Sequence, residues 1–157
     1  MDDETPWLTA EEQDAWRALV GVLARLPHAL DSQLSRDAGL RHFDYGVLSR
    51  LSEAPARTLR MGELAGAAEG SLPRLSQVVA RLEKRGLVRR TPDPADGRYT
   101  LATLTDEGWE AVAAAAPGHV AEVRRLVFDA LEPVMVAQVA EIGSRILQRV
   151  DPQGRSV

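Results

Sequence analysis

Apolar residues recur every three or four positions near the N-terminal end of the chain. The series is Trp16, Leu19, Leu23, Leu26, Leu30 and Leu34. This spacing places the side chains on one face of a helix, and Thr9-Ala10-Glu11-Glu12 has the form of a capping box at its start. We therefore expect a long helix over residues 9–35, bent at Pro27 because proline removes a backbone hydrogen bond.

A second apolar series near the C-terminal end mirrors the first. It comprises Leu131, Met135, Val139, Ile142, Ile146 and Val150. With 157 residues, the chain is too short for its middle part to cover two long apolar faces. We therefore expect helices 9–35 and 130–150 to pair with the same helices of a second copy, which predicts a homodimer. An intramolecular helix bundle is the alternative.

Shorter elements are predicted in the middle of the chain. Asp44 is a candidate cap for a helix that turns Tyr45, Leu48 and Leu51 inward and ends at Ala54-Pro55. A short extended segment at residues 58–59 then leads to a helix over residues 61–68.

The next segment predicts a tight turn and a second helix. Gly70 breaks the preceding helix, Ser71 can cap the new one, and Gly86 ends it. The inward positions of this helix are Leu75, Val78, Val79 and Leu82. Its outer face therefore carries Ser71, Arg74, Gln77, Arg81, Lys84 and Arg85.

Two strands are predicted on either side of a loop rich in Pro, Asp and Gly at residues 91–98. Thr105 or Asp106 then caps a connecting helix over residues 105–129, bent at Pro117-Gly118. The chain is thus predicted to be mostly α-helical with a small β-hairpin, in a single domain over residues 1–157.

Helix, turn, helix and basic hairpin, in this order, predict a winged helix-turn-helix lobe over residues 41–104. In such a lobe the second helix enters the major groove of double-stranded DNA and the hairpin reaches the minor groove. Arg74 and Gln77 suit base edges. Ser71, Arg81 and Lys84 are expected nearer to phosphates. Arg98 could enter the minor groove, or could serve only the turn by pairing with Asp96. The predicted DNA contacts are Ser71, Arg74, Ser76, Gln77, Arg81, Lys84 and Arg98.

Charge is unevenly distributed along the chain, although the net charge is only −4. Residues 1–40 carry 3 basic and 8 acidic side chains, residues 41–98 carry 11 and 7, and residues 99–157 carry 5 and 8. The basic middle coincides with the predicted lobe, which favours a polyanionic partner. A dimeric module that binds another protein is the competing interpretation, but it does not need a basic outer face on the second helix.

Composition argues against several other functions. The chain has no cysteine and no recognisable phosphate loop or nucleophile elbow, so we expect neither an enzyme nor a cofactor. The histidines His28, His42 and His119 lack the i, i+4 spacing of a metal site, so we expect no metal. The longest uncharged stretch has 11 residues, well short of a membrane span, and the N-terminus is acidic. We expect a cytoplasmic protein with no membrane partner.

Residues 82–90 (LEKRGLVRR), 96–98 (DGR) and 104–108 (LTDEG) resemble the MarR family of bacterial transcription regulators. The resemblance covers residues 9–150 and implies a homodimer joined by its first and last helices, bound to a palindromic operator. It also implies repression that a small ligand relieves. Family ligands, often aromatic anions, bind between the dimer helices and the lobe. By analogy the pocket here comprises Trp16, Leu23, His28, Asp31, Phe43, Tyr45 and Trp109, with core packing as the alternative role of its aromatic members.

Overall fold

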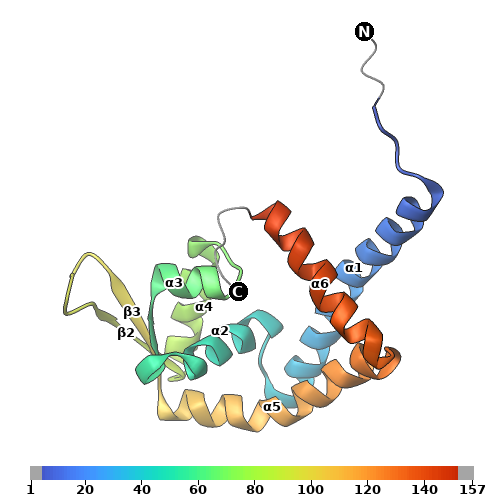
Figure 1. The fold of residues 1–157 in the computed structure, drawn as a ribbon. Coiled ribbons are helices and arrows are strands. Elements are labelled where there is room, and N and C mark those ends of the chain that lie inside the picture. The colour runs from blue at the N-terminus through green and yellow to red at the C-terminus, as the bar shows by residue number, and fades with distance from the viewer. Residues whose placement is uncertain (1–4, 152–157) are drawn as a thin grey trace.

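A computed structural model describes residues 5–151 (Figure 1). Three antiparallel strands form one sheet in the order β1-β3-β2, and helices account for most of the remaining residues. The elements are α1 (Ala10–Ala38), α2 (His42–Glu53), a 3₁₀ turn η1 (Pro55–Arg57), β1 (Thr58–Arg60), α3 (Met61–Ala67), α4 (Leu72–Lys84), β2 (Val88–Pro92), β3 (Thr100–Leu104), α5 (Asp106–Leu126), a 3₁₀ turn η2 (Phe128–Ala130) and α6 (Pro133–Val150). This is the mostly helical fold with a small β wing that the sequence predicts.

One hydrophobic core joins α2, α3, α4 and the sheet to the C-terminal end of α1 and the first half of α5. Leu34 of α1, Leu48 of α2, Leu64 of α3 and Val79 of α4 are all 0% exposed within it. Each buried aliphatic side chain of this kind stabilises the fold by about 1.5–3 kcal/mol. The four inward positions predicted for the second helix of the helix-turn-helix are all buried in this core.

The predicted capping box begins α1. Thr9 Oγ1 accepts a hydrogen bond from Glu12 N at 3.2 Å, and the Glu12 carboxylate accepts one from Thr9 N at 2.8 Å. The helix continues through Pro27 as far as Ala38, three residues beyond the predicted end at residue 35.

The start of α2 differs from the prediction. Arg41, not Asp44, occupies the N-cap position, and no side chain at that position caps the helix. Asp31 of α1 takes the capping role, because Asp31 Oδ1 accepts a hydrogen bond from His42 N at 2.8 Å. Asp44 lies within the first turn of α2, buried, where it pairs with Arg81. Asp44 therefore pairs with an arginine of another helix, although the local sequence favours it as a helix cap.

Local capping signals do define α4. Ser71 is its N-cap, and its hydroxyl accepts from Arg74 N at 3.4 Å. At the other end Gly86 has a φ of 74°, a left-handed conformation that favours glycine. Gly86 N donates to Glu83 O at 2.9 Å and Leu87 N donates to Leu82 O at 3.0 Å, which is a Schellman motif.

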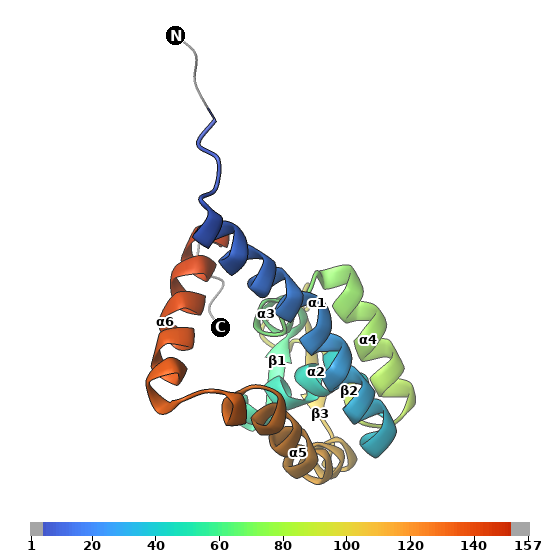
Figure 2. The same cartoon turned by 90° about the vertical axis from the view of Figure 1, so that its right-hand side faces the viewer.

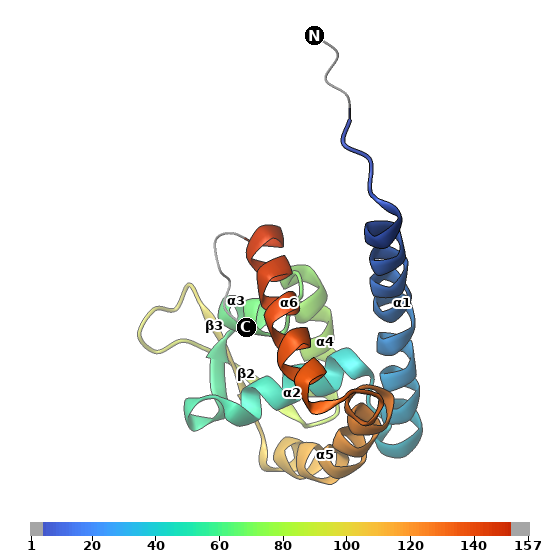
Figure 3. The ribbon, with the colours of Figure 1, turned by 45° about the vertical axis from the view of Figure 1, so that its right-hand side comes forward.

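The sheet holds the hairpin against the helix-turn-helix. β2 pairs with β3 as predicted, with Val88 opposite Leu104. The extended segment at residues 58–59 becomes β1 and adds a third strand, with Thr58 opposite Thr103. Thr105 caps α5, which decides between the two candidates. The hairpin loop projects from the lobe on the side away from the N-terminal half of α1 (Figures 1 and 3).

The two terminal helices extend beyond the lobe. Figures 1 and 2 show α6 leading away from the end of α5 and standing apart from α2, α3 and α4. None of the residues of α6 is buried in the single chain. Its exposed large apolar side chains include Met135, Val139, Ile142 and Ile146. Across the described residues, no helix combines the length and apolar character that a membrane crossing requires.

Candidate nucleic-acid interface

α4 presents a polar face to solvent. Its apolar positions are buried, and the amphipathic sequence therefore fixes which side chains point outward. Of the predicted DNA contacts on this helix and its cap, Ser71, Arg74, Gln77 and Lys84 are exposed, whereas Ser76 and Arg81 are half-buried.

Arg74 lies against an aromatic ring. Its guanidinium carbon is 4.0 Å from the centroid of the Phe43 ring, at the start of α2. Phe43 is one of the residues predicted to line an effector pocket, but its ring lies beside a predicted DNA contact. Neither the periodicity nor the charge pattern indicates this contact.

Arg81 is engaged with α2. Its Nη2 lies 2.5 Å from Asp44 Oδ1, and Asp44 is 2% exposed. The pair holds α4 on α2, while 42% of the Arg81 side chain is still exposed. A phosphate at this position would have to share the guanidinium with Asp44.

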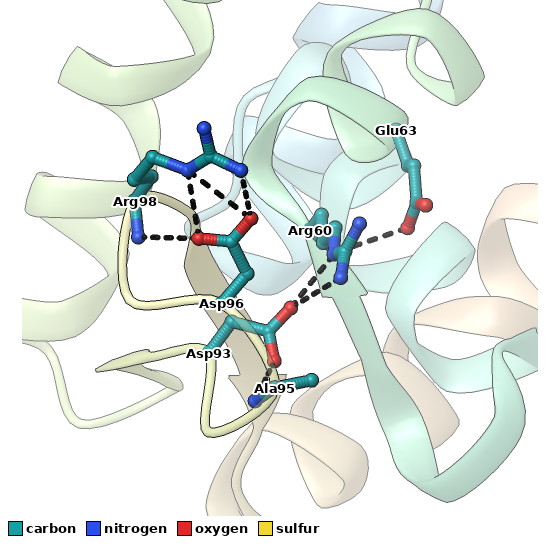
Figure 4. A network of polar contacts seen from close by, with 6 residues as sticks. All are labelled: Arg60, Glu63, Asp93, Ala95, Asp96 and Arg98. Carbon is teal, nitrogen blue, oxygen red and sulfur yellow. Dashed lines mark hydrogen bonds and ion pairs between the residues drawn. The ribbon is translucent and has the colours of Figure 1, made fainter.

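Arg98 lies at the tip of the hairpin and is 84% exposed (Figure 4). Its Nη2 is 2.6 Å from Asp96 Oδ2, and its backbone N donates to Asp96 Oδ1 at 3.2 Å. These hydrogen bonds hold the pKa of Asp96 below its ordinary value. The carboxylate therefore remains ionised and fixes the direction of an exposed guanidinium.

A second ion pair holds the base of the hairpin loop (Figure 4). Asp93 is 7% exposed, and it accepts hydrogen bonds from Ala95 N at 2.9 Å and from Arg60 Nε at 2.8 Å. Both bonds lower the pKa of Asp93, the Ala95 amide more strongly. The Arg60 guanidinium also lies 4.6 Å from the centroid of the Tyr99 ring. Arg60, at the junction of β1 and α3, thus links the hairpin to the helix-turn-helix.

A third pair joins α4 directly to β2. Arg90 Nη2 lies 2.7 Å from Glu83 Oε2, and the hydrogen bonds from Arg90 lower the pKa of Glu83. Lys84 and Arg89 form no ion pair with any described residue. The basic middle of the sequence therefore contains cations that fix the fold and cations that remain open to a polyanion.

The predicted effector pocket is not assembled as one described cavity. A hollow of about 390 Å³ on α1 is lined by Trp16, Arg17, Val20, Gly21, Ala24 and Arg25, which include only one predicted pocket residue. Leu23 and His28 are exposed on the same helix, and Trp109 lies beneath Arg57, with 4.3 Å from guanidinium carbon to ring centroid. Asp31 caps α2, as described above.

Tyr45, the remaining predicted pocket residue, is buried and belongs to a cluster with the half-buried His42 and His119, of which the sequence gives no sign. The centroid of its ring is 4.6 Å from that of His119, which is 5.7 Å from that of His42. The Nδ1 atoms of His42 and His119 are buried without a hydrogen-bond partner. Burial lowers the pKa of both histidines; the charge of Asp31 opposes this effect at His42, and the charge of His42 adds to it at His119. Among residues 5–151 no three His, Asp or Glu side chains form a group able to hold a metal.

Comparisons with known proteins agree with this geometry. A model of the MarR family matches residues 39–98. Transcriptional regulator HosA of Escherichia coli O111:H- is 40% identical over 73 residues, or 46% of this chain and 53% of HosA. The chain thus spans about half the length of HosA.

Solved structures extend the similarity along almost the whole chain. Sco3205 of Streptomyces coelicolor, a MarR family transcriptional regulator crystallised in complex with DNA, is 49% identical, and the match covers 94% of this chain and 92% of Sco3205 with a TM-score of 0.89. CouR of Rhodococcus jostii RHA1, crystallised with p-coumaroyl-CoA, is 28% identical, with coverage of 91% and 95% and a TM-score of 0.74.

The fold and the exposed basic face of α4, with the wing beside it, define a winged-helix regulator of transcription. The chain belongs to the MarR family. The similar proteins are transcriptional regulators, which confirms the prediction that the chain is not an enzyme.

Proposed function

We propose that the chain is a homodimeric, sequence-specific DNA-binding regulator that represses transcription from a palindromic operator and is released by a small aromatic or anionic ligand. The observation that carries this proposal is the exposed polar face of α4 beside a hairpin that ends in an exposed, oriented Arg98. The DNA complex of Sco3205 supports the same partner here.

In this proposal α4 lies in the major groove. Arg74 and Gln77 read base edges, with Ser76 beside them, while Ser71, Arg81 and Lys84 contact phosphates. Arg98 enters the adjacent minor groove, where its charge is attracted by the negative potential of a narrow groove.

Dimerisation is proposed through the N-terminal half of α1 and through α6. Both helices expose apolar side chains that the single chain leaves uncovered, including Trp16, Leu23, Met135, Val139 and Ile142. A two-fold axis would place two copies of α4 on successive major grooves, about 34–36 Å apart. A ligand between these helices and the lobe would release DNA if it bound better to a dimer with a different spacing.

A mobility-shift assay with the DNA upstream of the protein's own gene tests the proposal. The wild type should give a discrete, competitor-resistant band at about 100 mM salt, and the size of the free protein should be that of a dimer. The double variant Arg74→Ala/Gln77→Ala should lose the band. Arg145→Ala, which removes the same charge on α6, is the matched control and should keep it. A dimer that binds no fragment specifically would favour the protein-interaction module instead.

The effector part is tested separately on the protein–DNA complex. The complex is titrated with p-coumarate and, separately, with p-coumaroyl-CoA, which is the ligand in the CouR structure. Either compound should reduce the shifted band if the chain binds aromatic anions. An unchanged band would remove support for this ligand class and leave the DNA-binding part of the proposal intact.

A further inference from the structure

The contact between Phe43 and Arg74 joins the first turn of α2 to the first turn of α4. The backbone of Phe43 is fixed on both sides. His42 N donates to Asp31 Oδ1 at 2.8 Å, and Asp44 is buried in its pair with Arg81. The half-buried ring also packs against the hydrophobic core. Phe43 is therefore a rigid surface next to a flexible side chain.

Gly70, in the turn before α4, leaves space for this ring. A Cβ atom at this position would lie 2.6 Å from Phe43 Cζ and 3.0 Å from Cε2. The backbone of Gly70 does not require a positive φ. Any side chain at residue 70 would thus displace the ring, and the absence of one keeps Phe43 under the Arg74 guanidinium.

Stacking differs from the way other arginines of the lobe are held. Arg81 and Arg90 direct N–H groups at Asp44 and Glu83. A guanidinium over a ring face is attracted through its planar surface and keeps its N–H donors, which point outward in its plane. Arg74 forms no ion pair with a described carboxylate, so its donors stay available for a bidentate contact.

We infer that Phe43 is a positioning residue for base recognition: its ring holds the Arg74 guanidinium in a preformed orientation at the entry of α4, with Gly70 providing the space. The inference rests on the proposed DNA binding and deepens it. Phe43 limits the rotamers of Arg74 before DNA binds, so less side-chain entropy is lost in the complex. Base preference at the position read by Arg74 then depends on a residue that does not read a base itself.

The first test compares Phe43→Leu with Phe43→Tyr in the full chain. Affinities for the operator and for a set of its single-base variants are measured by fluorescence anisotropy, with Arg74→Ala identifying the base pair that Arg74 reads. Phe43→Leu should lose about 2- to 5-fold in affinity for the operator and relax preference at that base pair alone. Phe43→Tyr, which keeps a ring, should retain the wild-type profile.

A merely structural role of Phe43 predicts a different result. Phe43→Leu would then weaken binding to every sequence by the same factor and leave the base-preference profile unchanged, which would overturn the inference. If the wild type bound no DNA specifically, the proposed function would fail first, and the DNA role of Phe43 with it. The two failures are therefore distinguishable.

Gly70→Ala tests the same geometry without altering Phe43 or Arg74. The added methyl should displace the ring and reduce preference at the same base pair. Gly66→Ala is the matched control, because a Cβ at Gly66 meets nothing within 4 Å. Adding Gly70→Ala to Phe43→Leu should have little further effect, since contacting residues are not additive. Additive losses would contradict the inference.

Discussion

The winged-helix lobe and the two terminal helices differ in how far the single chain buries their apolar side chains and pairs their charges. In the lobe, apolar residues of α2, α3 and α4 are buried, and buried carboxylates such as Asp44 and Asp93 are paired with arginines. In α6 no residue is buried, and an apolar stripe as regular as that of α4 faces solvent. The lobe therefore buries its apolar side chains within one chain. The terminal helices expose apolar side chains that a second copy of the chain could cover.

The largest effect of a substitution is expected at the terminal helices. Ile142→Glu would put a charge in the proposed interface, where an unpaired buried charge costs about 3–5 kcal/mol, and a two-fold interface contains it twice. We expect the dimer to dissociate and operator binding to be lost, while the lobe keeps its secondary structure. Sedimentation velocity measures the dissociation of the dimer, and circular dichroism measures the secondary structure that is retained.

Gln148→Glu is the matched control for Ile142→Glu, because Gln148 lies on the polar side of α6 with Glu141, Ser144, Arg145 and Arg149. The control should remain dimeric. A dimeric Ile142→Glu protein would contradict the assignment of this stripe to the interface.

The second largest effect is expected inside the lobe. Arg81→Met leaves the Asp44 carboxylate buried without its partner and should lower the free energy of unfolding by about 3 kcal/mol. Urea denaturation measures the change. Adding Asp44→Asn removes the buried charge and should restore most of the stability. If Arg81→Met is as stable as the wild type, the ion pair does not hold α4 on α2.

Arg74→Ala should act on DNA binding and not on folding. Arg74 is exposed, so its loss should leave unfolding nearly unchanged, while binding to the operator weakens by about 1–3 kcal/mol and base preference relaxes at one position. Lys84→Ala, a proposed phosphate contact, is the comparison: it should weaken binding to all sequences equally. Unchanged specificity in Arg74→Ala would refute its reading role.

Arg98→Ala should have a smaller effect, visible in the salt dependence. Loss of one cation from the DNA minor groove in each protomer should reduce the slope of log affinity against log salt by up to ~1 per protomer. Asp96→Asn keeps the cation but weakens the pairing that orients it, so it should lower affinity with a smaller change in slope. Equal affinity and slope in Arg98→Ala would leave Arg98 with a role in the turn only.

The elements predicted correctly from the sequence are those that depend on neighbouring residues. The Thr9 capping box, the Ser71 cap and the Gly86 end of α4 are formed within a few positions, so their signals are visible in order along the chain. The amphipathic face of α4 is equally local, since its period of 3.6 residues decides which side chains are buried.

The remaining contacts depend on residues that folding brings together. The bond from His42 N to Asp31 spans 11 positions and the Arg60–Asp93 pair spans 33, so sequence spacing could not predict either. The stacking of Arg74 on Phe43 has the same origin. For this reason the outward face of α4 could be predicted, but not the side chains that hold this helix in place.

The smallest predicted effect concerns the partly buried cluster in which His119 of α5 meets His42 and Tyr45 of α2. Burial lowers the pKa of both histidines below the ordinary value of about 6.5. Between the lowered and the ordinary pKa the unfolded chain binds more protons than the folded one, so stability rises with pH through this window and falls as pH drops below about 6.5. Carboxylates with lowered pKa values affect the pH dependence of stability only below about pH 5, outside this window.

Urea denaturation between pH 5.5 and 7.5 should therefore show decreasing stability toward the acidic end. The double variant His42→Gln/His119→Gln should show a flatter profile even if packing losses lower its stability throughout, because neither replacement side chain titrates. A wild-type profile without slope, or a double variant with the same slope, would mean that the cluster does not couple protonation to folding. A positive result would identify the contact between α2 and α5 as a place where partly buried histidines couple protonation to the stability of the fold.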